Sequence, residues 1–389
     1  MSENKSKQII IVAGEASGDM HGSYLINEIK KIDPSIRFSG LGGSQIQASG
    51  AEIYYDLTKL AVIGFYEVLK HYKEIKKAFN LILKVIKESK PAAVILIDYP
   101  GFNLRLAEEI KKLKIDTKVI YYISPQIWAW KKNRIKAIKK NIDKMLVLFD
   151  FEEKIYLNSG VTAKFVGHPL VDEVKSTISK EDFLESLGLS SYKMTIGILP
   201  GSREKEVQRH LPLMLGAAKI LKDDYPMMQF IVIKAPTISE SLIKEFLPDN
   251  QPHIKIIGSN TYDAINSCES CMVASGTATL ETAILCRPMV VVYKTSWLTW
   301  ILAKLFLKIP NIGLVNVVAQ KRIVPECIQL SANPNRIASE ISELFTNEIR
   351  LANIKNELKK VATALGTTGA SRNAAKEVIN MIFPAEGKS

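Results

Sequence analysis

The fold prediction begins at residues 271–281, which read CMVASGTATLE. The apolar residues 272–274 are typical of the end of a buried strand, and a helical pattern starts at Thr277. Between these two patterns, Ser275 and Gly276 carry so little side-chain bulk that a ligand can reach the backbone. A helix that begins at such a turn directs unpaired N–H groups and the positive end of its dipole toward its ligand, which suits a phosphate.

Glu281 lies about one turn inside the same expected helix. A carboxylate at this position can accept hydrogen bonds from ribose hydroxyls, as acidic residues do in other nucleotide-binding α/β domains. The alternative is an ordinary strand-to-helix turn with an exposed Glu281, because short glycine motifs are weak signals. The local sequence leaves both interpretations open.

Two other stretches repeat the order of strand, glycine-bearing turn and helix: residues 8–13 (QIIIVA) before Gly14, and residues 194–199 (MTIGIL) before Gly201. Such units build parallel sheets with helices on both faces. We therefore predict an α/β fold with two Rossmann-like, doubly wound domains that face a cleft. The expected divisions are an N-terminal domain over 1–170, a C-terminal domain over 171–345 that begins with a polar linker, and C-terminal helices over 346–389 that pack back on the first domain.

Asp98 ends an otherwise apolar strand expected over 92–98, at the edge of a parallel sheet where ligands bind. Its carboxylate must face a cleft or be paired, and within reach of a nucleophilic hydroxyl it can act as a general base. A structural cap on the following helix is the alternative. Glu15, Ser17 and Asp19 follow the strand at 8–13, so we expect them to meet the same substrate.

Arg203 follows Gly201 and Ser202 at the expected start of a helix. A guanidinium group together with backbone N–H groups can clamp a pyrophosphate. The alternative is a surface arginine, which the helix dipole disfavours at this end unless an anion lies between them. His168 has three open interpretations, as a ligand, a base or a packing residue.

The charge of the chain favours an anionic partner. The 52 Lys and Arg against 40 Asp and Glu give a net charge of +12, which fits nucleic acid, an anionic lipid surface or a phosphorylated substrate. The stretches 57–86 and 297–309 mix apolar residues with lysines, a pattern that suits an anionic membrane surface unless it is core packing. No nucleic-acid-binding fold signature accompanies the lysines, so we expect no nucleic-acid partner.

Four cysteines in 389 residues do not form a disulfide framework. Cys268 and Cys271 form one C-x-x-C pair without a second pair, so we expect buried thiols and no metal site. The polar N-terminus does not have the pattern of a signal peptide, so we expect none, and no apolar run reaches the length of a membrane span. We expect a cytoplasmic protein, or one that binds the membrane from the cytoplasmic side.

Together these motifs resemble those of the lipid-A-disaccharide synthases, a family of bacterial glycosyltransferases. The resemblance covers nearly the whole chain, and the order and spacing of the motifs make it specific. The motifs are GEASGD at 14–19, GLGG at 40–43, IGF at 63–65, EVL at 67–69, DYPGFN at 98–103, SPQIWAW at 124–130, GHPL at 167–170, LPGSR at 199–203, SGTATLE at 275–281, Asn316, and VPE at 324–326.

The resemblance implies the two-domain GT-B fold and an inverting transfer in lipid A biosynthesis. UDP-2,3-diacylglucosamine would react with 2,3-diacylglucosamine 1-phosphate (lipid X) to give the β(1→6) disaccharide 1-phosphate and UDP. Asp98 would deprotonate the acceptor hydroxyl, without a cofactor or a metal. The C-terminal half would bind the donor through Gly201, Ser202, Arg203, Ser275, Gly276, Thr277, Glu281, Asn316 and Glu326. The N-terminal half would bind the acceptor through Glu15, Ser17, Asp19, Asn103 and Trp128.

Two other functions remain open at this stage. Another GT-B enzyme that acts on UDP-N-acetylglucosamine, such as an epimerase or a peptidoglycan glycosyltransferase, would not need the apolar basic stretches. A non-catalytic basic protein that binds membranes would not need Asp98. For the synthase, we expect the two acylated substrates and an anionic membrane surface as partners, at the cytoplasmic face of the inner membrane. A homodimer, the acyl-chain length and the roles of Lys321 and Arg322 are left open.

Overall fold

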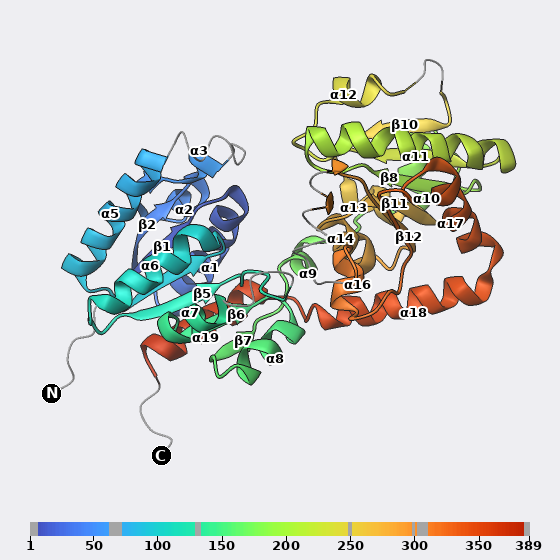
Figure 1. The fold of residues 1–389 in the computed structure, drawn as a ribbon. Helices are drawn as coiled ribbons and strands as arrows, with labels where there is room; N and C mark the ends of the chain where they lie inside the picture. The colour runs from blue at the N-terminus through green and yellow to red at the C-terminus, as the bar shows by residue number, and fades with distance from the viewer. Residues whose placement is uncertain are drawn as a thin grey trace. The chain divides into compact units, whose positions relative to one another are not determined.

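The computed structural model describes residues 7–61, 72–128, 134–247, 251–297, 300–301 and 310–384. The chain divides into two compact units, the first formed by Met1–Pro169 with Gly366–Ser389 and the second by Leu170–Leu365. Each unit has a parallel sheet flanked by helices, as Figure 1 shows. Within the described residues, no helix has both the length and the apolar character needed to cross a bilayer.

The first unit contains a seven-stranded parallel sheet in the order β3-β2-β1-β4-β5-β6-β7. Its strands are β1 (Gln8–Ala13), β2 (Arg37–Gly42), β3 (Glu52–Asp56), β4 (Ala93–Ile97), β5 (Lys118–Tyr122), β6 (Lys144–Val147) and β7 (Ala163–Phe165). Its helices are α1 (Ala16–Ile32), α2 (Ser44–Ala48), α3 (Thr58–Ala61), α5 (Tyr72–Ser89), α6 (Pro100–Lys112), α7 (Arg134–Asn141), α8 (Asp150–Asn158) and α19 (Ala370–Ile382).

The second unit contains a six-stranded sheet in the order β10-β9-β8-β11-β12-β13. Its strands are β8 (Thr195–Leu199), β9 (Gln229–Ile233), β10 (Ile254–Ile257), β11 (Ser270–Ala274), β12 (Met289–Tyr293) and β13 (Glu326–Ile328). Its helices are α9 (Leu170–Glu173), α10 (Lys180–Ser186), α11 (Glu204–Asp224), α12 (Glu240–Lys244), α13 (Thr261–Asn266), α14 (Ala278–Ile284), α16 (Leu314–Val318), α17 (Pro334–Thr346) and α18 (Glu348–Ala364).

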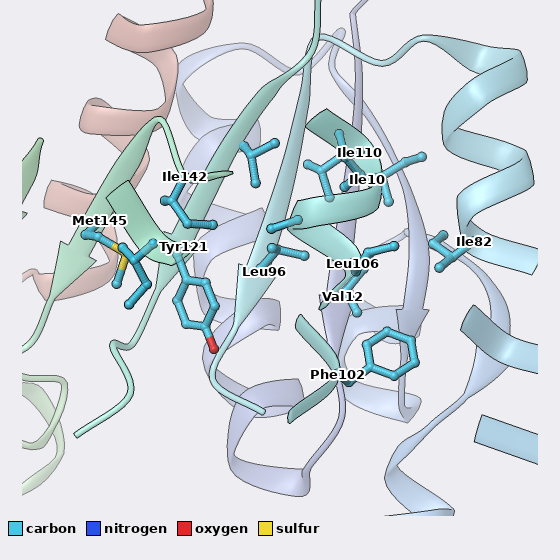
Figure 2. Close-up of a cluster of buried hydrophobic side chains, with 14 of the residues drawn as sticks. Ile10, Val12, Ile82, Leu96, Phe102, Leu106, Ile110, Tyr121, Ile142 and Met145 are labelled. Carbon is cyan, nitrogen blue, oxygen red and sulfur yellow. The ribbon is translucent and has the colours of Figure 1, made fainter. Parts of the chain in front are cut away.

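The central strands are continuous apolar runs because helices cover both of their faces. Every residue of β4 is buried. Figure 2 shows one side of this core, where Leu96 of β4 and Val12 of β1 lie beside Leu106 of α6. On the other side of the sheet, α1 packs against α19. These layers hold the carboxyl ends of β1, β4 and β5 together at one edge of the sheet.

The apolar face of α5 belongs to the core. Ile82 and Ile86 are fully buried, and the ring of Phe79 packs edge-on against Phe102 of α6 with centroids 5.3 Å apart. The part of the expected membrane stretch that lies in α5 therefore packs most of its apolar residues against the protein, leaves Tyr72 and Leu81 exposed, and exposes its lysines. Residues 62–71 of that stretch, and most of the second stretch at 297–309, lie outside the described residues.

The C-terminal helices are shared between the two units. Helix α18 packs against α14 and α16 in the second unit, whereas α19 packs against α1 and β5 in the first. Polar contacts that hold α19 include an ion pair between Lys144 and Glu377 and a hydrogen bond from Asn373 Nδ2 to the carbonyl of Val166 at 3.1 Å. The segment expected over 346–389 thus contributes to both units.

Candidate active site

Asp98 lies directly after β4, in a backbone turn that few residues adopt. Asp98 and Tyr99 both have left-handed conformations, with φ of 44° and 46°, and each costs on the order of 1–3 kcal/mol unless its surroundings hold it. The carbonyl of Asp98 accepts hydrogen bonds from the Tyr121 hydroxyl at 2.5 Å and from Asn103 Nδ2 at 2.8 Å. The turn is therefore fixed by β5 and α6.

The Asp98 carboxyl group is held in a poorly solvated place beside another carboxylate. Burial and, to a smaller extent, the charge of Glu15 raise the pKa of Asp98 to about 6, although the backbone N–H of Tyr99 acts in the opposite direction. The ring of Tyr99 covers Gly14, where a Cβ atom would lie only 2.3 Å from Tyr99 Cδ1. The structure thus brings the ends of β1 and β4 together, as the sequence predicts.

The other expected acceptor residues have different environments. Glu15 and Ser17 are exposed at the start of α1, whereas Asn103 is fully buried. The Asn103 amide donates to the carbonyls of Ile97 and Asp98, so its observed contacts fix the Asp98 turn. Trp128 is partly buried, and its indole N–H donates to Glu152 at 3.0 Å. The sequence analysis did not identify Glu152.

Asp19 is 4 % exposed and caps a helix. Its carboxylate accepts backbone N–H groups from Gly43 at 2.7 Å, Gln45 at 3.0 Å and Ile46 at 3.2 Å, at the start of α2. A carboxylate is favourable there, because it satisfies the unpaired N–H groups and the positive end of the helix dipole. The contacts observed for Asp19 are therefore structural, although the sequence favoured substrate binding.

We expect Asp19→Ala to lower the free energy of unfolding by about 2–3 kcal/mol, because buried N–H groups lose their acceptor. Urea denaturation followed by circular dichroism measures this change. Ser17→Ala, at an exposed position on the same helix, is the matched control and is expected to change stability by less than about 0.5 kcal/mol. A loss for Asp19→Ala as small as that of the control would contradict the capping role.

The second unit contains a pocket of about 570 Å³ at the carboxyl ends of its central strands. Among the residues expected to bind the donor, Gly201, Ser202, Ser275, Gly276, Thr277 and Glu281 line it. Sequence reasoning missed other lining residues, including Lys175, Lys234, Asn260 and Tyr262. Lys175 and Lys234 lie in two loops, Asn260 and Tyr262 lie at the start of α13, and no local motif marks these positions. The volume is within the range typical of small-molecule sites.

Arg203 precedes α11 at the rim of this region and does not line the pocket. Its side chain is 82 % exposed, and its Nη1 lies 3.3 Å from Glu206 Oε1. Glu206 also accepts the backbone N–H of Ser202 at 3.3 Å, so this carboxylate takes the place that an anion would have at the start of the helix. An exposed ion pair of this kind contributes little to stability.

Glu281 faces the pocket from α14. Burial raises its pKa to about 7, and the charge of Glu173 contributes to the same shift. Tyr262 shares this corner, and burial together with the charges of Glu281 and Glu173 raises the pKa of its phenol to about 12. These three groups form a weakly solvated polar corner at the side of the Ser275–Thr277 turn.

Asn316 and Glu326 form a buried network next to the pocket, and neither lines it. The Glu326 carboxylate accepts from Asn316 Nδ2 at 2.8 Å and from the backbone N–H groups of Ile312 and Gly313. Ser275 Oγ in turn donates to the carbonyl of Ile312 at 3.0 Å. The network therefore holds the chain that supports the Ser275 turn.

Other residues considered from the sequence are buried or partly buried. Cys268 and Cys271 are buried free thiols. Burial lowers the pKa of His168 to about 4, with a contribution from His21, and its ring packs against Phe149 with centroids 5.3 Å apart. Within the part of the chain that the structure describes, no group of three or more His, Cys, Asp or Glu side chains could hold a metal ion.

Comparison of the sequence with known proteins gives full-length matches. The model of a family described as lipid-A-disaccharide synthetase matches residues 9–383. A lipid-A-disaccharide synthase of Syntrophus aciditrophicus is 42 % identical over 378 residues, with 97 % of this chain and 98 % of that protein covered. A lipid-A-disaccharide synthase of Geobacter metallireducens is 39 % identical over 382 residues, with 98 % of this chain and 99 % of that protein covered.

Solved structures with the same fold are more distant in sequence. A UDP-N-acetylglucosamine 2-epimerase from Neisseria meningitidis, bound to UDP-GlcNAc, aligns with a TM-score of 0.63 at 12 % identity and covers 96 % of this chain and 100 % of its own. The calicheamicin glycosyltransferase CalG4 aligns with a TM-score of 0.60 at 11 % identity, covering 97 % and 98 %. The fold is therefore that of the GT-B enzymes, and at such low identity the likeness extends to the fold alone.

Proposed function

The chain belongs to the lipid-A-disaccharide synthase family, and we propose that its first unit binds the acceptor, lipid X, while its second unit binds the UDP-sugar donor. It is a glycosyltransferase of lipid A biosynthesis. The identity of about 40 % to synthases along the whole chain distinguishes this activity from that of the epimerases, which share the fold at 11–13 % identity. It also excludes the alternative of a non-catalytic basic protein.

The single observation that supports the acceptor assignment is the environment of Asp98. Its carboxyl group lies at the carboxyl end of β4, partly buried and near Glu15, and its pKa is raised to about 6. A carboxylate with a raised pKa is a stronger base than an exposed one and is still ionised at neutral pH. We assign Asp98 as the group that removes the proton from the acceptor 6-hydroxyl as that oxygen attacks the donor carbon.

The donor assignment is supported by the pocket of the second unit. Backbone groups at Gly201 and at the Ser275–Thr277 turn are open to it, and Lys175 and Lys234 bring positive charge to the same lining. We propose that these groups and Arg203 hold the diphosphate of UDP, and that Glu281 accepts hydrogen bonds from the ribose. Asn316 and Glu326 would act on the donor indirectly, by holding the turn at Ser275.

A direct experiment tests the division of roles. Purified protein is incubated with UDP-2,3-diacylglucosamine and lipid X in detergent, and the products are followed by mass spectrometry while UDP binding is measured by calorimetry. We expect the tetraacyl disaccharide 1-phosphate and UDP in equal amounts. Loss of UDP binding on substitution of first-unit residues alone would overturn the division.

The raised pKa of Asp98 predicts a pH profile. With donor saturating, kcat/KM for the acceptor should rise about tenfold per pH unit below pH 6 and level off above it, because only the ionised carboxylate accepts the proton. Initial rates between pH 4.5 and 8 measure this profile. Saturation with donor keeps the titration of Glu281 from contributing through donor binding. A rate that is flat from pH 5 to 7 would exclude Asp98 as the base.

We also propose that the outer face of α5 contacts anionic lipid at the cytoplasmic face of the inner membrane. Its lysines at 73, 76, 77, 84 and 87 are all exposed. Each basic residue near an anionic surface contributes about 1 kcal/mol. The contact would be electrostatic, because the apolar side of α5 is buried in the core. Size-exclusion chromatography with light scattering measures whether the protein forms a homodimer.

The triple change Lys73→Glu, Lys76→Glu and Lys77→Glu should weaken binding to phosphatidylglycerol vesicles by about 100-fold or more, with little effect on neutral phosphatidylcholine vesicles. Vesicle co-sedimentation at low salt measures it. Lys355→Glu with Lys359→Glu and Lys360→Glu, all exposed on α18, is the charge-matched control. Equal losses in the two variants would mean that net charge, and not the α5 face, drives binding.

A further inference from the structure

Glu152 is a buried carboxyl group for which the reaction described above has no use. It lies in the first turn of α8, just after β6, and is 3 % exposed. Its Oε1 accepts hydrogen bonds from Ser124 Oγ at 2.8 Å and from Trp128 Nε1 at 3.0 Å. A carboxylate is costly to bury unless hydrogen bonds compensate, so its presence here requires a reason.

The segment that Glu152 contacts has an unusual backbone. Ile123, which directly follows β5, has a φ of 65°. The left-handed region is strongly unfavourable for a β-branched residue and persists only where the surroundings hold it. Ser124 comes next, so its hydrogen bond to Glu152 fixes the chain directly after the strained residue. Ile127 then closes a tight turn, with its N–H 2.6 Å from the carbonyl of Pro125.

Trp128 is fixed at two places by α8. The indole N–H is held by Glu152, and the ring packs edge-on against Phe151 with centroids 5.6 Å apart. Phe151 is stacked in turn on Phe149 at 5.5 Å. An indole whose polar edge is already bonded presents a rigid apolar face, which is the surface that a sugar ring or an acyl chain packs against.

The same cluster is adjacent to the Asp98 turn. Strands β4 and β5 are neighbours, with Ile97 opposite Tyr122, so Asp98 and Ile123 both lie at the same edge. Tyr121 hydrogen-bonds the carbonyl of Asp98. Burial, and then the charges of Asp98 and Tyr156, raise the pKa of Tyr121, while burial and the charge of Glu152 raise the pKa of Tyr156. Tyr121 and Tyr156 thus lie within electrostatic range of Asp98 and Glu152, respectively.

We propose that Glu152 is a positioning residue of the acceptor site, which sets the place of Trp128 and of the chain after β5 through two hydrogen bonds to one oxygen. Glu152 does not itself contact substrate. The inference rests on the proposed binding of the acceptor by the first unit. In this proposal, the buried carboxyl group of Glu152 holds the indole ring of Trp128 in place, and the acceptor packs against the face of that ring.

Three variants separate this role from a purely structural one. Glu152→Gln keeps an oxygen that accepts from both donors, Glu152→Ala removes it, and Trp128→Phe keeps an aromatic ring without the N–H group. We expect Glu152→Ala to raise KM for lipid X about tenfold and to leave KM for the donor and the Kd for UDP unchanged. In Glu152→Gln, KM for lipid X should stay within about twofold of the wild-type value. In a Trp128→Phe background, Glu152→Ala should have a much smaller effect.

A measurement independent of activity accompanies the kinetics. In ¹⁵N-labelled protein, the indole N–H signal that disappears in Trp128→Phe belongs to Trp128. This signal should move upfield in Glu152→Ala and stay close to its wild-type position in Glu152→Gln.

Two results would overturn the inference. The first is an indole signal that does not change in Glu152→Ala, and the second is an apparent kcat that falls in proportion to lost folded protein while KM for lipid X stays unchanged. A failure of the proposed acceptor site can be distinguished from a failure of the role of Glu152. If the acceptor site is wrong, Asp98→Asn leaves transfer intact, although the indole signal of Trp128 still depends on Glu152.

Discussion

Asp98→Asn is expected to lower the rate of sugar transfer by about a thousandfold and to leave UDP binding unchanged. The amide has nearly the shape of the carboxyl group but cannot take a proton from the acceptor hydroxyl. General-base catalysis typically contributes 10²–10⁴ in rate, and this contribution is lost in the amide. UDP binding should persist, because the pocket proposed for the donor lies entirely in the second unit.

The same substitution should make the protein more stable at neutral pH. The folded-state pKa of about 6 lies above the ordinary value of 3.8, so the ionised carboxyl group is disfavoured in the folded state. This cost is absent below pH 4, grows as the pH rises toward 6 and is complete above it. Removing the charge at pH 7.5 should therefore increase the free energy of unfolding by about 1–3 kcal/mol. A gain in stability with a loss of activity is the combination typical of an active-site residue.

Initial rates by mass spectrometry, UDP titration by calorimetry and urea denaturation at pH 4 and 7.5 provide the three measurements. Asp116→Asn, at a side chain that is 86 % exposed in the first unit, is the matched control. Transfer that stays within tenfold of the wild type would remove Asp98 from the mechanism. A simultaneous loss of stability and UDP binding would instead indicate a general folding defect.

Arg203→Ala is expected to lower kcat/KM for the donor by about 100-fold. The exposed guanidinium is free to leave Glu206 and pair with the diphosphate, where its fork of N–H groups matches the oxygens and the charge that develops on departing UDP. Removing one donor of this kind to a developing anion typically costs 10²–10³ in rate. Stability should not change, because the ion pair with Glu206 is exposed.

Arg203→Lys should recover only part of the loss, because a lysine supplies charge without the bidentate geometry. Arg209→Ala, at an exposed position on the same helix, is the matched control. Steady-state rates at varied donor concentration, together with UDP calorimetry, separate binding from chemistry. Equal and small effects in Arg203→Ala and Arg209→Ala would show that the guanidinium has no role at the diphosphate.

Much of the fold could be predicted from local patterns. The buried runs at 8–13 and 92–98 and the turn at 275–277 identified β1, β4 and the junction between β11 and α14, because continuous apolar strands followed by small residues are signals contained within a few positions. The placement of Glu15 beside Asp98 was also predictable, since parallel strands end at a common edge.

The sequence by itself therefore determined two parallel α/β units, the family and the edge of each sheet where chemistry is expected. Only the tertiary structure decided what the polar side chains contact. Asp19 caps α2 through Gly43, which is 24 residues away in the sequence, and Glu152 accepts a hydrogen bond from Ser124, which is 28 residues away. The apolar face of α5 packs in the core. Periodicity reports which face of an element is apolar, but the partner of a buried polar group depends on which distant segments the fold brings within hydrogen-bond distance, and that is fixed only when the sheet assembles.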